Sequence, residues 1–360
     1  MKKRLTVGFI AAIAIFNLPQ TSEACTGITL TAQDSTTIVA RTIEWGGSDL
    51  NSQYVVVPRG YTAQSYTPEG VNGMQFTSRY GYVGLAVEQK EFIAEGLNEM
   101  GLSAGLFYFP RYGKYVAYNA ENKSKTIADL QLVAWLLGEC ATVDDVMDAV
   151  KDVDIVQIAP RASTVHWRFT DPTGRQAVLE IVDGKLQFFE NKLGVLTNSP
   201  GFEWQITNLN NYVNLFPGSA NAQDFGNIQL SSFGVGSGAL GLPGDVTPPS
   251  RFVRAAFYQT TAPKQPTAED AVLQGFQIMN NFDIPLGAEF PKGQATVDIP
   301  SATQWTSATD MTNRRIYYRT MRNSAIRCFD LNKIDFTKIK YKATPLDNVK
   351  HQPIEMVKVK

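Results

Sequence analysis

Histidine is scarce in this chain, because only His166 and His351 carry an imidazole among its 360 residues. A Ser–His–Asp or Cys–His arrangement would need one of them as its base. His166 lies in a β-branched, apolar stretch with no partner nucleophile near it, so we interpret it as a structural residue. His351 lies in a polar C-terminal tail. The sequence therefore offers no histidine base for nucleophilic catalysis.

Several other chemistries lack their residues. The chain has no HExxH, CxxC or paired-histidine spacing, which argues against a metal site, and no P-loop or GxGxxG motif. The glycines of 234–238 lie in a loop and are interpreted as flexible. A net charge of -1 without basic, aromatic-interleaved runs argues against nucleic acid as a partner. We expect neither cofactor nor metal.

Cysteine is also rare, since three residues are too few for a disulfide scaffold in a chain of this size. Cys140 and Cys328 could pair in an oxidising compartment or remain free thiols, and their spacing leaves both possibilities open.

The first 24 residues have the pattern of a signal peptide. Basic residues at 2–4 precede an apolar stretch at 7–16, and Ser22 and Ala24 are small residues at the -3 and -1 positions of a cut. We expect a periplasmic or secreted protein without stable membrane insertion after cleavage. An uncleaved anchor and a lipoprotein signal are the alternatives, although Ser22 and Glu23 do not fit the usual lipoprotein box.

A cut after Ala24 would make Cys25 the first residue of the mature protein. Its α-amino group would titrate at about 7.7–8.0 and its thiol at about 8.5, so proton exchange between them is feasible near neutral pH. Such a residue is a nucleophile that carries its own base. The competing interpretation is a lone structural cysteine at the start of a strand.

The remaining chain predicts an α+β fold with largely antiparallel sheets. Residues 26–31 and 36–43 are expected to form a hairpin that brings Arg41 back beside residue 25, although an arginine in such a run usually faces solvent. Further strands are expected at 54–57, 80–87, 92–94, 103–109, 153–158, 164–170, 176–182, 186–190, 303–310, 314–321 and 325–330. Helices are expected at 126–137, 143–150, 202–215, 250–258 and 268–280. The segment 95–102 is expected to be rich in turns, and 217–249 to be a long loop. We expect residues 25–360 to form a single domain.

Five short motifs give the chain a resemblance to a known family. They are CTG at 25–27, RTIEW at 41–45, EGLNEMGL at 95–102, LTNSP at 196–200 and SRFVR at 250–254. Together they resemble the choloylglycine hydrolase family, which includes bile salt hydrolases and penicillin V acylases. The family implies a four-layer αββα fold, N-terminal-nucleophile amidase activity and a homotetramer.

The resemblance also implies roles for individual residues. Cys25 would be the nucleophile, with its α-amino group as base, and Arg41 would lie beside the thiolate. Asn198 and the backbone N–H of Tyr108 would form the oxyanion hole. Arg251 matches the second active-site arginine, which orients the region of the nucleophile.

The motif at 41–45 contributes further expectations. Glu44 stands where the family often has Asp, and it is expected to hold the α-ammonium group on a longer arm. Ile43 and Trp45 are expected to contact substrate. Tyr108 replaces an Asn common in Gram-positive bile salt hydrolases, while Glu44 and Trp45 resemble the Gram-negative branch.

We therefore expect a hydrolase of linear amide C–N bonds that acts on a small amphiphilic amide. Glycine- or taurine-conjugated bile salts are the first expectation, and penicillin V or acyl-homoserine lactones are the alternatives. A periplasmic lipoprotein or binding protein acylated at Cys25 is the non-enzyme alternative. A catalytically inactive relative that binds amphiphiles is the third possibility.

Overall fold

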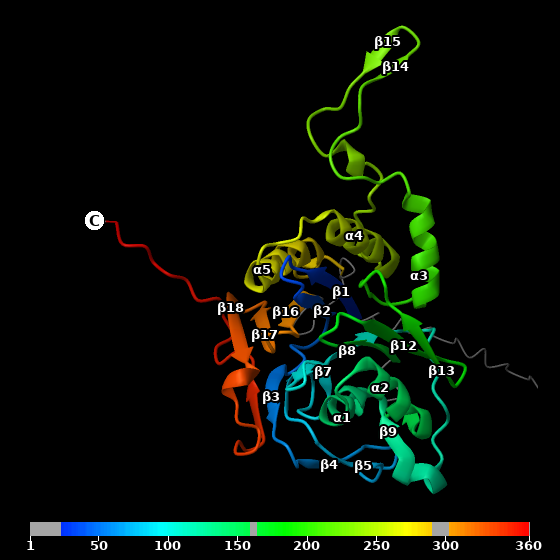
Figure 1. Cartoon of the computed structure of the whole chain (residues 1–360), viewed down its shortest axis with the longest axis vertical. Coiled ribbons are helices and arrows are strands. Elements are labelled where there is room, and N and C mark those ends of the chain that lie inside the picture. Colours follow the sequence, from blue (N-terminus) through cyan, green and yellow to red (C-terminus); the bar gives the residue numbers. More distant parts are fainter. Residues whose placement is uncertain (1–22, 159–163, 290–301, 360) are drawn as a thin grey trace, which may run out of the picture.

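The structure is a computed structural model that describes residues 23–158, 164–289 and 302–359. The signal-peptide prediction for residues 1–24 therefore lies almost entirely outside the described residues. Within these ranges the chain forms two large antiparallel sheets that face each other, with helices on both outer sides (Figure 1). The expected four-layer αββα arrangement is confirmed.

The first sheet has five strands and contains the N-terminal hairpin. Its order is β1 (Glu23–Thr31), β2 (Thr37–Trp45), β16 (Ala302–Asp310), β17 (Arg315–Thr320) and β18 (Asn323–Asp330). Helices α4 (Pro248–Thr261) and α5 (Ala268–Met279) pack on its outer face, against β1, β2 and β16. Because helices cover one face of β2 and the second sheet covers the other, eight of its nine residues are buried.

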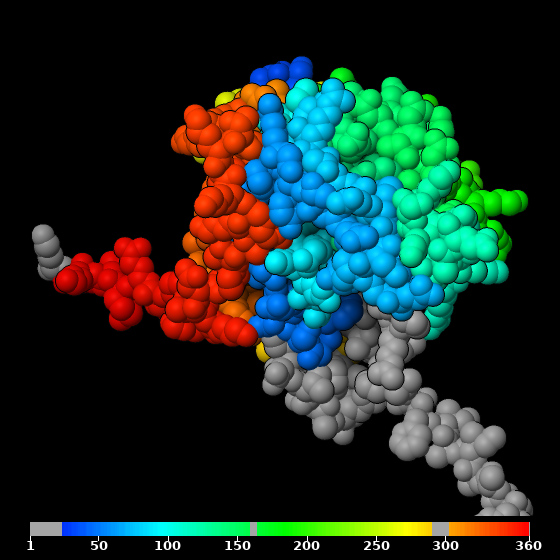
Figure 2. Space-filling view, turned by 90° about the horizontal axis from the view of Figure 1, so that it is seen from below, coloured from blue at the N-terminus to red at the C-terminus, as the bar shows by residue number. Residues whose placement is uncertain are grey.

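The second sheet has eight strands, all antiparallel to their neighbours. Their order is β13 (Lys185–Glu190), β12 (Gln176–Val182), β11 (Val165–Thr170), β8 (Ser103–Tyr108), β7 (Ile93–Asn98), β6 (Tyr82–Ala86), β3 (Gln53–Val57) and β19 (Lys342–Pro345). Helices α1 (Leu132–Glu139) and α2 (Val143–Ala149) cover its outer face. Figure 2 shows the blue-to-green N-terminal half of the chain on the lower face, with the orange-red C-terminal segment packed beside it.

Three small two-stranded sheets lie outside the two large ones. They are β4 (Thr62–Gln64) with β5 (Gln75–Thr77), β9 (Thr126–Ala128) parallel to β10 (Asp154–Val156), and β14 (Gln223–Phe225) with β15 (Ile228–Leu230). The last pair lies in the expected long loop, at the end of an arm that projects from the body beyond α3 (Phe202–Asn208) (Figure 1).

Several local predictions were wrong. Thr126 does not begin a helix, because Thr126 and Ile127 pair with β10 and the helix α1 starts only at Leu132. Residues 95–98 belong to strand β7, and the turn is confined to 99–101, where Gly101 has a φ of 91°. The polar tail after residue 333, for which no element was predicted, contributes strand β19, which pairs with β3.

The capped helix at 143 is confirmed. The Thr142 side chain accepts a hydrogen bond from the Asp145 N–H, and the Asp145 carboxylate accepts one from the Thr142 N–H, which is a complete capping box. By contrast, α3 is shorter than expected, since a 3₁₀ turn over Leu209–Tyr212 follows it.

The register of the β1–β2 hairpin decides which side chains share a face. Cys25 lies opposite Ile43, and Gly27 lies opposite Arg41. Because side chains alternate along a strand and cross-strand partners share a face, these four residues point to the same side. Arg41 contacts the eight-stranded sheet, so this is the face between the sheets.

A close approach between the sheets depends on Gly27. A Cβ atom at this position would lie 3.0 Å from Cζ of Phe107 and 3.3 Å from Nη1 of Arg168. Both of these side chains are buried. Glycine therefore lets β1 lie directly against the second sheet, two residues from Cys25.

Gly27→Ala is expected to lower the free energy of unfolding by about 1–3 kcal/mol, because the added methyl group overpacks the space between the sheets. Urea denaturation measures the change. Gly244→Ala is the control, since a Cβ there meets no atom within 4 Å and should leave stability nearly unchanged. Equal stability of the two variants would contradict the close-packing argument.

Candidate active site

The thiol of Cys25 lies between the two sheets and contacts the guanidinium of Arg41. Nη2 of Arg41 donates a hydrogen bond to Sγ of Cys25 over 2.9 Å. The expectation that the hairpin brings these residues together is confirmed. The exposed fraction of Cys25 is 3% in this chain, in which Glu23 and Ala24 still precede it in strand β1.

Arg41 is fully buried, contrary to the usual position of an arginine in a β-branched run. Its Nη1 donates to the carbonyls of Leu106, over 2.6 Å, and Ala94, over 3.0 Å. The guanidinium also lies 4.2 Å from the centroid of the Phe107 ring. The second sheet therefore supplies the acceptors that fix this cation beside the sulfur.

On the other side of the cysteine, Asn198 binds the backbone. The Cys25 N–H donates to Oδ1 of Asn198 over 3.0 Å, and Nδ2 of Asn198 donates to the Tyr108 carbonyl over 2.7 Å. The Tyr108 backbone N–H hydrogen-bonds the Cys25 thiol. The two residues assigned to the oxyanion hole by resemblance thus both contact Cys25.

Arg251 connects this cluster to helix α4. Its Nη1 donates to the Cys25 carbonyl over 2.6 Å and to Oγ1 of Thr26 over 2.7 Å. Its Nη2 donates to Oδ1 of Asn198 over 2.7 Å. A planar guanidinium can make these contacts at once, and it thereby fixes both the backbone of Cys25 and the orientation of the Asn198 amide.

The groups around the Cys25 thiol have opposing effects on its pKa. Burial raises the pKa of Cys25, and it outweighs Arg41, the Tyr108 N–H and Arg251, which act to lower that pKa. Glu44 adds to the rise. In the chain that keeps Ala24, residue 25 has no free amino group, and burial therefore favours the protonated thiol.

Glu44 lies opposite Ala24 across the hairpin and is buried. Burial raises its pKa to about 7, although Arg251 opposes the shift. Its Oε1 accepts a hydrogen bond from Oγ1 of Thr303 over 3.4 Å, while its Oε2 has no hydrogen-bond partner within the described ranges. The carboxylate is therefore able to accept a further donor.

The two residues expected to contact substrate flank Glu44. Ile43 lies directly opposite Cys25 and is buried on the same face. Trp45 is half-buried and lies opposite Glu23 on one side and Ala302 on the other. The structure thus brings Ile43 beside the thiol, and it places Trp45 at the end of the same strand.

His166 has both ring nitrogens engaged away from Cys25. Nδ1 lies 3.0 Å from Oε1 of Glu180, Nε2 lies 3.0 Å from the Thr197 carbonyl, and the ring stacks on Phe109. The interpretation of His166 as a structural residue is confirmed. Cys140 and Cys328 are both free thiols.

Two buried residues near the site were not predicted. Glu95 and Arg168 form an ion pair of 2.6 Å on the inner face of the second sheet, and Glu95 also lies 3.8 Å from Arg41. Glu95 lies in one of the five motifs, but the expected turn hid its position in a strand. Arg168 had no local signal, because an arginine in a strand ordinarily faces solvent.

Residues 23–158, 164–289 and 302–359 contain neither a metal-binding cluster nor a helix that could span a membrane. Within them no cluster of three or more histidine, cysteine or acidic side chains could hold a metal ion. None of the helices described there is long and apolar enough to cross a membrane.

Comparison with known families gives a match over residues 25–345. The matching family is that of linear amide C–N hydrolases, the choloylglycine hydrolase family. The match begins at Cys25 and covers both large sheets with their helices.

The similar proteins include bile salt hydrolases and penicillin V acylases. The bile salt hydrolase/transferase of Clostridium perfringens is 32% identical over 91% of this chain and 99% of that protein. The penicillin V acylase of Pectobacterium atrosepticum is 26% identical over 86% of this chain and 81% of that protein. A crystal structure of a mutant conjugated bile acid hydrolase from Clostridium perfringens has a TM-score of 0.80 at 29% identity, covering 93% of this chain and 100% of that chain.

The raised pKa of Glu44 predicts a pH dependence of stability in the chain that keeps Ala24. The unfolded carboxyl loses its proton near its ordinary value of 4.5, whereas the folded one keeps it to about pH 7. The contribution of Glu44 to the free energy of unfolding is therefore fully present below pH 4.5. It falls by about 3 kcal/mol as the pH rises to about 7.

Glu44→Gln is expected to remove this fall, because glutamine does not ionise. Urea titrations at pH 4.5 and 7.5 of the full chain, expressed so that Ala24 stays attached, measure the difference. Glu203→Gln, at an exposed carboxyl of α3, is the control and should follow the unsubstituted chain. Equal changes in the Glu44 and Glu203 variants would contradict this role of the Glu44 carboxyl.

Proposed function

Because the chain belongs to the choloylglycine hydrolase family of linear amide C–N hydrolases, we propose that it cleaves the amide bond of conjugated bile salts with Cys25 as its N-terminal nucleophile. The family makes it a hydrolase of amide bonds. The substrate, the nucleophile and the roles of the surrounding residues are the proposal.

One observation carries the proposal, namely that the nitrogen and the sulfur of Cys25 are held in place by different partners. The nitrogen lies 3.0 Å from Oδ1 of Asn198, and the sulfur lies 2.9 Å from Nη2 of Arg41. A cut after Ala24 would turn this nitrogen into an α-amine on the same residue as the thiol. A base would then stand beside the nucleophile in a site where the neighbouring His166 has both ring nitrogens engaged elsewhere.

Glu44 supports the same chemistry. Its position opposite Ala24 would be next to the new α-ammonium group once residues 1–24 are removed. Its Oε2, unpaired within the described part of the chain, would then accept a hydrogen bond from that group.

The reaction follows from these positions. The α-amine takes the thiol proton, and the thiolate, held by Arg41, attacks the amide carbon to form a C–S bond. The negative charge on the carbonyl oxygen is stabilised by the Tyr108 N–H and the Asn198 amide. The C–N bond breaks, the leaving amine takes the proton from the α-ammonium, and water releases the acid from the thioester.

The comparisons favour bile salts as the substrate class. The bile salt hydrolase/transferase relatives reach 32% identity, compared with 26% for the penicillin V acylase. Either a glycine or a taurine conjugate would supply the amide. Penicillin V remains the second candidate because that relative spans 86% of the chain, and acyl-homoserine lactones share the same pairing of a large apolar acyl group with a small polar amine.

The proposed location is periplasmic or secreted. The basic start, the apolar stretch and the small residues before Cys25 support export with removal of residues 1–24, and residues 25–360 would then form a single domain. In the non-enzyme alternative, a lipoprotein or binding protein, Cys25 would instead carry a lipid, which would block its amino group.

The exported protein is expected to begin at Cys25 and to hydrolyse glycocholate or taurocholate, with penicillin V and an acyl-homoserine lactone assayed in parallel. Intact mass establishes the first residue and any lipid. Cys25→Ala is expected to lower kcat/KM by at least about 1,000-fold, because the nucleophile is removed. Cys140→Ala is the matched control and should keep activity.

Two results would contradict the proposal. One is a diacylglycerol mass on Cys25. The other is a correctly processed protein that hydrolyses none of these amides, or hydrolyses them equally well as Cys25→Ala.

We further propose that the protein assembles as a homotetramer through the arm, residues 213–246. The arm projects from the body (Figure 1), and its apolar side chains are exposed, with Phe233 and Val235 fully open to solvent. Such contiguous exposed apolar residues are typical of an interface between protein chains. The second copy of this chain is the proposed partner, as the resemblance to the family implied.

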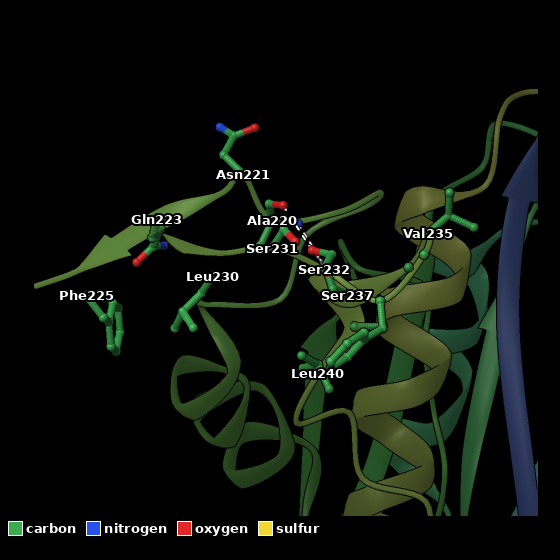
Figure 3. Close-up of a pocket in the computed structure, with 14 residues that line it drawn as sticks. Ala220, Asn221, Gln223, Phe225, Leu230, Ser231, Ser232, Val235, Ser237 and Leu240 are labelled. Atoms are coloured by element: carbon green, nitrogen blue, oxygen red, sulfur yellow. Dashed lines mark hydrogen bonds between the residues drawn. The ribbon is translucent and has the colours of Figure 1, made fainter. Parts of the chain in front are cut away.

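A hollow within the arm supports this assembly. Phe225, Leu230, Val235 and Leu240 lie around it, and its volume is about 600 Å³ (Figure 3). The lining is contributed by the arm itself, so the hollow does not belong to the site around Cys25. Apolar side chains of a neighbouring copy would fill it and remove this surface from water.

Phe233→Ser combined with Val235→Ser is expected to produce a smaller assembly, because the apolar contact is lost while the fold of the body is untouched. Light scattering coupled to gel filtration measures the mass. Leu273→Ser, at an exposed position of α5 on the body, is the control and should keep the mass of the unsubstituted protein. A monomeric unsubstituted protein, or an unchanged mass in the double variant, would refute the role of the arm.

A further inference from the structure

Three charged side chains from three strands meet between the two sheets. Arg41 comes from β2, Glu95 from β7 and Arg168 from β11, and each is at most 1% exposed. Removing charges from water is costly, so a buried cluster with two cations and one anion calls for a physical reason. The sulfur of Cys25 lies 2.9 Å from Nη2 of Arg41, where the excess positive charge could interact with it.

The two carboxylate oxygens of Glu95 lie at different distances from the two arginines. Its Oε1 accepts hydrogen bonds from Nη2 of Arg168 over 2.6 Å and from Oγ of Ser103 over 3.2 Å. Its Oε2 lies 3.8 Å from Nη1 of Arg41, beyond hydrogen-bond distance. Arg168 is therefore the principal partner of this carboxylate.

Arg41 makes no hydrogen bond with Glu95, which lies 3.8 Å away. Its Nη1 hydrogens go to the carbonyls of Ala94 and Leu106, and its Nη2 donates to the Cys25 sulfur. A carboxylate in direct contact with Arg41 would neutralise this cation and weaken its attraction for a thiolate. The arrangement leaves one net positive charge beside the sulfur.

Arg168 has donors beyond those its ion pair needs. Its Nε and Nη1 have no hydrogen-bond partner anywhere in the described parts of the chain, although a purely structural buried arginine would ordinarily be satisfied. Its Nη1 approaches β1 at Gly27, where a Cβ would lie 3.3 Å away. The guanidinium also lies 5.5 Å from the centroid of Phe107, whose ring Arg41 approaches at 4.2 Å.

We propose that Arg168 is a positioning residue for the reaction, which holds the Glu95 carboxylate away from Arg41 and so leaves the Arg41 guanidinium to the Cys25 sulfur. This inference rests on the proposed role of Cys25 as nucleophile. Arg168 itself does not touch the reacting atoms. It acts through Glu95 and Arg41.

The charged groups near the Cys25 sulfur come from several elements of the fold. Arg41 faces it from β2, whereas Glu44, on the other face of β2, and Arg251 of α4 act on its pKa from the helical side. Glu95 and Arg168 stand behind Arg41 on β7 and β11. Burial lowers the pKa of Arg168, while Glu95 opposes that shift, so the carboxylate favours the charged guanidinium.

The test measures how the alkylation rate of Cys25 by iodoacetamide depends on pH, which reports its thiolate directly. Processed protein carrying Cys328→Ser removes the exposed thiol, and mass spectrometry of the Cys25 peptide gives the rate. Arg168→Met is expected to raise the midpoint by about one pH unit, because Glu95 is then left to Arg41. Amide hydrolysis below that midpoint should fall about tenfold and recover at higher pH.

Two further variants separate this role from a structural one. Arg168→Lys keeps the charge and is expected to return the midpoint most of the way to that of the unsubstituted protein. Arg168→Met combined with Glu95→Gln removes the carboxylate as well and is expected to lower the midpoint again. This pair tests the proposal even if Arg168→Met alone fails to fold.

An unchanged midpoint in Arg168→Met, or a midpoint that stays raised in the double variant, would overturn the proposal. Alkylation does not require amide hydrolysis. A protein that hydrolyses no amide but shows these midpoint shifts would therefore refute the proposed function and still support the coupling between Arg168 and Cys25.

Discussion

The contact between the Arg41 guanidinium and the Cys25 sulfur depends on the two sheets being held face to face. Arg41 comes from the first sheet, yet the carbonyls that fix it belong to strands β7 and β8 of the second. A buried cation needs such acceptors, because otherwise its desolvation would not be offset. The packing of the whole sandwich thus determines where this one charge lies, and Gly27 and Phe107 set how close the sheets come.

The opposite face of the same hairpin is organised by the helical layer. Arg251 reaches from α4 to the Cys25 carbonyl, to Thr26 and to Asn198. Strand β1 is consequently held from both sides at Cys25. The Cys25 side chain points toward the second sheet, and its backbone is fixed by Arg251 of the helical layer. A residue in this position has little freedom to reorient, which is the kind of preorganisation that a nucleophile requires.

The parts of the site that depend on local pattern could be predicted from the sequence. The β-branched run around Arg41 indicated the hairpin, and the hairpin placed Arg41 near Cys25. Asn198 and Arg251 lie far along the chain, so only the motifs that resemble a family connected them with Cys25. Glu95 and Arg168 were missed because an ion pair between two strands depends on a register that no local pattern specifies. The start of α1 was misplaced for a related reason, since Thr126 pairs with a strand about thirty residues later.

The pairing of Ala24 with Glu44 bears on the order in which the chain would fold and be cleaved. In the folded structure Glu23 and Ala24 are ordinary members of strand β1, and Ala24 is only 5% exposed. A peptidase needs its target segment extended and accessible, and here that segment is already incorporated into a sheet. If the chain is processed as proposed, cleavage after Ala24 and closure of the hairpin would compete for the same residues. A chain that closes the hairpin first would bury its own cutting site, so timing as well as recognition would decide how much of the protein matures.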